Sequence, residues 1–196
     1  MKGVAVVIAL LAAGRWLLRT GLFQRVCMIS YAAYQGSDPV SMAVATMSTT
    51  FEQSLLDADA ARASLAETPT LLILDNLETL AADNTLGELL DAALSWSEVG
   101  ASRVLLTSRQ PDCKHPGYPL AGDFSHQSLA LQGLREGDAV DWFDSLRRLP
   151  PKSRFKRPRR DVLLRLFGKV GFHPLSISLL AQQLKQRGPA EEMDRG

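Results

Sequence analysis

Two stretches of the chain place chemically useful side chains directly after a run of apolar residues. Asp75 closes the run "TLLILD", and Thr107, Ser108 and Arg109 close the run "SRVLL". A buried strand that ends in a carboxylate makes sense if the end of the strand faces a ligand. Asp75 is suited to holding a cation or a water molecule. Arg109 is suited to an anion, because a planar guanidinium matches the geometry of phosphate.

Both residues also have a plainer interpretation. An aspartate after an apolar strand is often a turn or capping residue, and an arginine after a strand is often a solvated charge. Asp75 suits a cation and Arg109 suits an anion, and each directly follows a predicted strand. The pair therefore favours one shared site.

Strand-like and helix-like segments alternate through the first two thirds of the chain, which predicts a mainly parallel sheet covered by helices on both faces. Ligands of such sheets bind at the carboxyl ends of the strands, where Asp75 and Arg109 are expected to lie. From Arg135 onward only helical patterns are visible. The expected strands are near residues 24–30, 70–75, 102–107 and, more weakly, 127–131, and the expected helices lie at 4–19, within 38–67, and at 85–100.

Composition limits the classes of function. The chain has 196 residues, 46% of them hydrophobic, and a net charge of +1, so its overall charge predicts neither a nucleic-acid nor an acidic partner. Cys27 and Cys113 fit no metal spacing and are expected to be reduced thiols of a cytoplasmic protein. The apolar run 3–14, between Lys2 and Arg15, is read as a buried helix or as a signal peptide; it is too short to span a membrane.

Four motifs together resemble the STAND-class regulatory NTPases of the NB-ARC type. "LLILDNLETL" resembles their Walker B segment and "SRVLLTSRQP" their sensor strand; "LALQGLREGDAVDWFDSL" and "GFHPLSISLLAQQL" resemble the passage into the helical subdomain and its "GxPL" motif. The resemblance implies an α/β domain with a P-loop NTPase-like parallel sheet over residues 1–132. A small, incomplete all-helical subdomain would follow over residues 133–196. It also implies ATP or ADP with Mg²⁺ as ligand, and protein partners or fused effector or repeat domains.

The resemblance assigns roles to individual residues. Asp75 would organise Mg²⁺ through water, and Arg109, with Thr107 on the same strand end, would contact the nucleotide's phosphates. Pro174, with His173 beside it, would pack on the adenine; alternatively, this pair is only the start signal of a helix.

Two departures from the family pattern bear on catalysis. The segment "GVAVV", Gly3 to Val7, lies where the family has the phosphate-binding "GVGKT". Gly3 fits, but Val6 and Val7 supply neither the cation nor the hydroxyl that such a loop uses. Asn76 stands where many relatives carry a second acid, and Glu78 is the nearest remaining candidate for that catalytic role. A truncated or degenerate domain with slow or absent hydrolysis is therefore expected.

The run 147–160 holds eight Lys or Arg residues, three prolines and no acid. It could touch nucleic-acid phosphates, or it could be a solvated linker, which its prolines favour. The leading hypothesis is therefore an ATP/ADP-binding switch domain of a signalling NTPase, with impaired binding and hydrolysis. The alternative is a nucleotide-free scaffold for protein contacts, and a DNA-binding regulator is the third reading.

Overall fold

The computed structural model divides the chain into two compact units, one ending at Leu129 and the other beginning at Ala130. This division lies close to the predicted boundary between residues 132 and 133. The residues that the structure describes are 14, 16–36, 38–80, 85–110, 113–119, 126–146 and 158–187.

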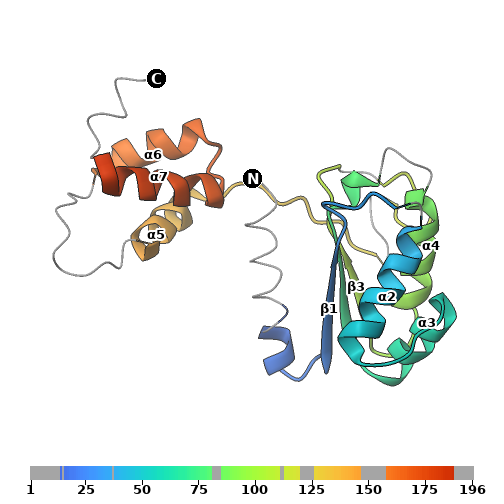
Figure 1. Ribbon diagram of the computed structural model, residues 1–196. Coiled ribbons are helices and arrows are strands. Elements are labelled where there is room, and N and C mark those ends of the chain that lie inside the picture. The colour runs from blue at the N-terminus through green and yellow to red at the C-terminus, as the bar shows by residue number, and fades with distance from the viewer. Residues whose placement is uncertain are drawn as a thin grey trace. The chain divides into compact units, whose positions relative to one another are not determined.

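The first unit is built on a three-stranded parallel sheet in the order β1-β2-β3 (Figure 1). Ser30 pairs with Asp75, and Leu74 pairs with Leu106, so the carboxyl ends of all three strands meet at one edge. The α/β class, three of the four predicted strands and the neighbouring positions of β2 and β3 are thus confirmed. The strands are β1 (Arg25–Ser30), β2 (Thr70–Asp75) and β3 (Arg103–Leu106).

The predicted fourth strand at 127–131 is wrong, because the structure gives these residues no strand. Leu129 and Leu131, which would share one face of such a strand, are 81% and 78% exposed. A strand is stabilised by its ladder and by burial of one face. Neither is present here in the described part of the chain, so local strand propensity alone does not produce the element.

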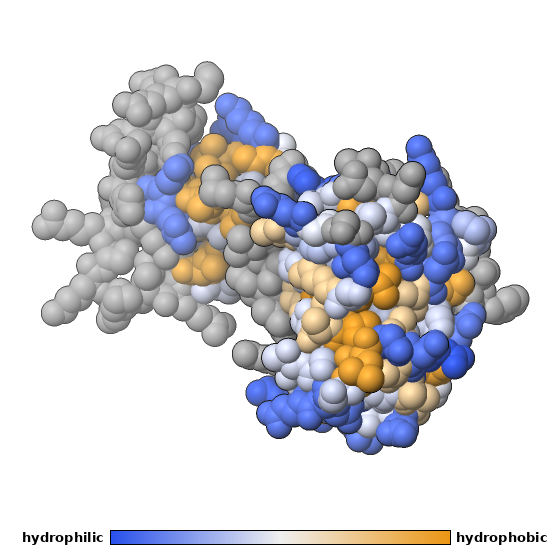
Figure 2. Space-filling view, turned by 45° about the vertical axis from the view of Figure 1, so that its right-hand side comes forward, coloured by the Kyte–Doolittle hydropathy of each residue, from blue (hydrophilic) through white to orange (hydrophobic). Residues whose placement is uncertain are grey.

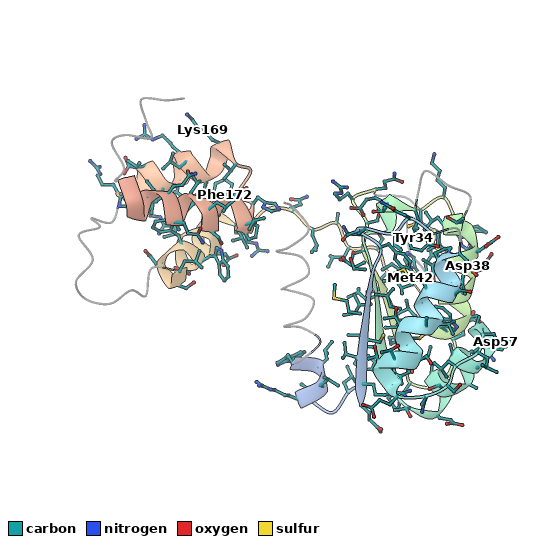
Figure 3. All side chains as sticks on the ribbon, viewed as in Figure 1. Tyr34, Asp38, Met42, Asp57, Lys169 and Phe172 are labelled. Atoms are coloured by element: carbon teal, nitrogen blue, oxygen red, sulfur yellow. The ribbon has the colours of Figure 1, made fainter. Side chains whose placement is uncertain are left out.

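Three helices, α2 (Pro39–Phe51), α3 (Ala58–Glu67) and α4 (Thr85–Ser97), lie on one face of the sheet (Figure 1). The first two begin at aspartate caps. Figure 3 shows Asp38 and Asp57 beside these helices. Asp38 accepts a hydrogen bond from the backbone N–H of Ser41, and Asp57 accepts one from the backbone N–H of Ala60. These carboxylates satisfy N–H groups that have no partner inside the helix, which fixes where each helix starts.

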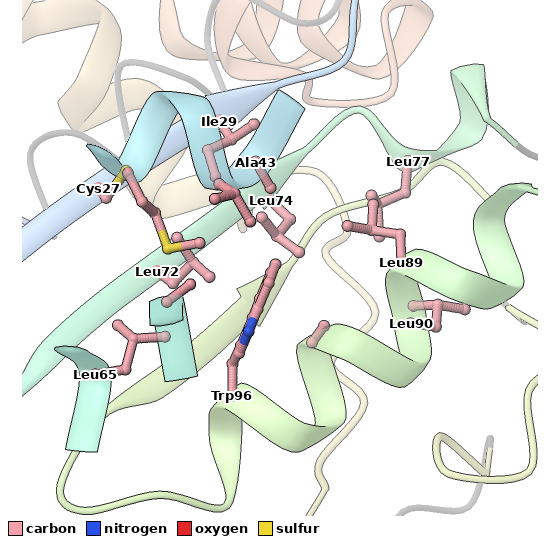
Figure 4. Packing of buried hydrophobic residues seen from close by; sticks show 14 of the residues in the cluster. Cys27, Ile29, Ala43, Leu65, Leu72, Leu74, Leu77, Leu89, Leu90 and Trp96 are labelled. Carbon is pink, nitrogen blue, oxygen red and sulfur yellow. The ribbon is translucent and has the colours of Figure 1, made fainter. Parts of the chain in front are cut away.

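The main core lies between these helices and the sheet, as Figure 4 shows. Trp96 of α4 is 1% exposed, and its indole N–H donates to the carbonyl of Ala58 at 3.1 Å. Leu72 and Leu74 of β2 are fully buried beside it. The core therefore holds the central strand, and with it Asp75, in a rigid setting.

The opposite face of the sheet has a smaller cluster of Phe23, Leu71 and Ile73, against which Leu17 packs. Residues 16–19 are helical, so this part of the predicted helix at 4–19 is observed, whereas its first part lies outside the described residues. Apolar side chains reach the surface in separate patches among hydrophilic ones (Figure 2). Of the helices described, none is long and apolar enough to cross a membrane.

In the second unit, the described residues form three helices: α5 (Glu136–Leu146), α6 (Arg160–Lys169) and α7 (Pro174–Arg187). Phe143 and Phe167, both fully buried, form the centre of their core with ring centroids 5.7 Å apart. Most of the basic run, residues 147–157, lies outside the described residues.

Two glycines of the first unit provide a matched test of the fold. Gly100, between α4 and β3, has a φ of +55°, and a Cβ there would lie 2.7 Å from the carbonyl oxygen of Ala66. Gly87 lies within α4, and a Cβ there would meet open space. We expect Gly100→Ala to lower the free energy of unfolding by about 1–3 kcal/mol. Gly87→Ala should raise it by about 0.5–1 kcal/mol.

Urea denaturation followed by circular dichroism measures both changes. Equal effects of the two substitutions would show that the chain does not turn at Gly100 in the way described.

Candidate functional site

Asp75 is the last residue of β2 and is only 1% exposed. One carboxylate oxygen accepts a hydrogen bond from the Thr107 hydroxyl at 2.5 Å, and the other lies 3.5 Å from the Ser30 hydroxyl. No Lys, Arg or His among the described residues forms an ion pair with Asp75. Burying a carboxylate without a compensating charge costs folding free energy, and Asp75 carries this cost.

The segment after Asp75 is tied to the segment after β3. Asn76 donates its backbone N–H to the Thr107 hydroxyl at 3.2 Å, and Leu77 donates to the Thr107 carbonyl at 3.0 Å. Asn76 has a φ of +64°, a left-handed conformation that asparagine tolerates better than most residues. This turn starts the short 3₁₀ helix η1 (Leu77–Thr79). The identity of Asn76 is therefore explained by its backbone conformation, whereas many of the proteins that the chain resembles carry an acid at this position.

Glu78, in η1, faces Arg109. Its carboxylate accepts hydrogen bonds from the Arg109 side-chain Nε at 2.5 Å and from the Arg109 backbone N–H at 3.2 Å. The Glu78 side chain is 10% exposed, and that of Arg109 is 73% exposed. Burial disfavours the charged carboxylate, but hydrogen bonds from the backbone N–H groups and the Arg109 side chain outweigh burial. The pKa of Glu78 is therefore lowered from its ordinary value.

The structure brings together most of the predicted site in the first unit. Asp75 and Thr107 touch, and Glu78 and Arg109 touch, on two segments that are hydrogen-bonded to each other. Thr107 was expected to contact nucleotide, but its hydroxyl is already engaged: it donates to Asp75 and accepts from Asn76. Its visible role is to orient the carboxylate.

Ser30 is the site residue that the sequence analysis missed. It ends β1 and pairs directly with Asp75 in the register of the sheet. The available signal was its position as the last residue of the first predicted strand, at the same edge as Asp75 and Thr107.

His173 and Pro174 belong to the second unit. Pro174 is the first residue of α7, and the carbonyl of His173 accepts the backbone N–H of Ile177. The carbonyl of Pro174 accepts from the Ser178 hydroxyl at 3.0 Å and from the Trp142 indole N–H at 3.4 Å. The pair thus starts a helix, and any role at the adenine stays a prediction. Gly3, the remaining predicted site residue, lies outside the described residues.

Comparison of the chain with protein-family models, with curated proteins and with solved structures finds no match. In the part of the chain that the structure describes, no three His, Cys, Asp or Glu side chains group in a way that could hold a metal ion. A cation at Asp75 would therefore keep most of its water shell or take further ligands from a bound phosphate, as Mg²⁺ commonly does.

Proposed function

We propose that the chain is the nucleotide-binding switch domain of a STAND-type regulatory NTPase, with ATP or ADP and Mg²⁺ as its ligands. Asp75 would hold Mg²⁺ through water, and Arg109 would contact the terminal phosphate. Pro174 and His173 would meet the adenine. Nucleotide exchange in such a domain shifts the balance between two arrangements of its parts.

The observation that carries the proposal is the setting of Asp75. It is buried at the carboxyl end of the central strand of a parallel sheet, where ligands of such sheets bind. Its described partners are two hydroxyl groups, with no cation among them. A buried carboxylate without a paired cation is costly to the fold, so a function for the charge is the simpler explanation. Arg109, on the neighbouring segment, supplies the complementary charge for an anion.

A second candidate is a nucleotide-free scaffold that uses the same fold for protein contacts. Val6 and Val7 favour it, because they stand where the family has the lysine and threonine of the phosphate loop. The two candidates differ in what Asp75 contributes, since a scaffold needs no buried charge.

The proposal is tested first by the stability of Asp75→Asn in the chain as it exists. Asparagine has the same shape, can still accept from the Thr107 hydroxyl and removes the buried charge. We expect the free energy of unfolding at pH 7 to stay the same or to rise by about 1 kcal/mol.

The matched control is Asp57→Ala, which removes a purely structural cap and should cost about 1 kcal/mol. Urea denaturation at pH 7 measures both. A loss of 2 kcal/mol or more in Asp75→Asn, roughly the cost of a broken buried hydrogen-bond network, would make Asp75 a structural residue and remove the main support for the proposal.

A further inference from the structure

The contact between Glu78 and Arg109 uses only one edge of the guanidinium. The Glu78 carboxylate accepts hydrogen bonds from Nε and from the backbone N–H of Arg109, so it binds both the guanidinium and the main chain of that residue. An arginine head has five N–H donors in a planar fork. In the described part of the chain, the four donors on the two terminal nitrogens have no hydrogen-bond partner, and the side chain is 73% exposed.

The two terminal nitrogens form the outer edge of the Arg109 guanidinium, and this geometry leaves that edge open to a bidentate anion. The two terminal nitrogens of a guanidinium match two oxygens of a phosphate group. A long side chain normally loses entropy when it binds. An arginine that is already held at Nε has less of this entropy left to lose, and this smaller entropic cost favours anion binding.

The same contact makes Glu78 a poor proton acceptor. Both of its oxygens already accept hydrogen bonds, and its pKa is lowered further from the neutral range in which a general base works best. The sequence indicated a catalytic role for Glu78, because it lies near Asn76, where many relatives carry a second acid. The surroundings of Glu78 do not favour that role.

We propose that Glu78 is a positioning residue, which fixes the guanidinium of Arg109 so that its outer edge binds the terminal phosphate group of a phosphoanhydride ligand. The hydrogen bonds between Leu77, Asn76 and Thr107 keep the two segments in register and so hold the pair beside Asp75. The proposal rests on the proposed function for the nature of its ligand, a nucleoside triphosphate.

The test follows the Arg109 side chain by ¹H–¹⁵N NMR of the full chain, assigned with Arg109→Ala. Inorganic pyrophosphate and Mg-ATP are titrated separately at millimolar concentration. In the unaltered chain, we expect a protected Arg109 Nε–H signal and shifts of the Arg109 resonances with pyrophosphate. In Glu78→Gln the protection should be lost, and pyrophosphate should bind about 3- to 10-fold more weakly, which corresponds to the cost of ordering one long side chain.

The expected direction is informative because simple electrostatics predicts the reverse: removing an acid beside an anion site should strengthen binding. Glu98→Gln is the matched control, since it removes the same charge from an exposed residue after the end of α4, where no change is expected. Equal or tighter pyrophosphate binding in Glu78→Gln, or an Arg109 Nε–H signal that is unchanged there, overturns the proposal.

The two titrations separate this proposal from the proposed function. Pyrophosphate binding that depends on Glu78 without any Mg-ATP binding would support the positioning role and contradict the nucleotide switch. Mg-ATP binding that is equally tight in Glu78→Gln would support the switch and contradict the positioning role. If neither anion shifts the Arg109 resonances, both proposals fail.

Discussion

The triple substitution Ala5→Gly, Val6→Lys and Val7→Thr is expected to raise the affinity of the chain for Mg-ATP by roughly 30- to several-thousand-fold. It restores the lysine and threonine that a phosphate-binding loop uses. One well-placed partner for a phosphate charge contributes on the order of 2–5 kcal/mol to binding, which gives this range. Isothermal titration calorimetry should show little heat for the unaltered chain at micromolar concentration and a complete binding curve for the variant.

The control for this result is the same variant with Val6→Met in place of Val6→Lys, which lengthens the side chain without adding a charge. It should bind no better than the unaltered chain. Adding Asp75→Asn to the restored loop should remove the dependence of ATP affinity and turnover on Mg²⁺, because the carboxylate that organises the ion is gone. Tight binding by the unaltered chain would mean that another cation, such as Arg109 or Arg15, replaces the loop lysine.

Phe167→Ala is expected to unfold the second unit while leaving the first unit folded. Phe167 is fully buried against Phe143, and truncating a buried phenylalanine costs about 3–5 kcal/mol. A core of three short helices supplies little more than about 3–5 kcal/mol in total. Hydrogen exchange measured by mass spectrometry should therefore show lost protection in α5, α6 and α7 and retained protection in β1, β2 and β3.

Leu179→Ala is the control for this experiment. Leu179 lies on α7 but is 42% exposed, so its truncation should cost less than about 1 kcal/mol and leave the exchange pattern unchanged. If Phe167→Ala removes protection from both units together, the chain unfolds as a single cooperative body and the division after Leu129 has no energetic meaning.

The sequence by itself determined the elements that are both locally encoded and buried. The run "TLLILD" is buried at every position of β2, and no helical amphipathic pattern competes with it. Asp38 before Pro39 and Asp57 before α3 are capping signals that act within a few residues. The placement of Asp75 and Arg109 at one edge followed from topology alone, since parallel strands end on the same side.

Only the tertiary structure decided what the site residues contact. The fourth strand was wrongly predicted because a strand needs a neighbour, and a sequence window around Leu129 and Leu131 does not show whether one is present. The structure pairs Thr107 with Asp75 and Glu78 with Arg109 by hydrogen bonds. The two residues of each pair lie some thirty positions apart in the chain. They arise from the register of β2 with β3 and from the left-handed turn at Asn76, neither of which leaves a local pattern. The physical reason is general: local sequence sets backbone preference, whereas hydrogen-bond partners are set by how the elements pack.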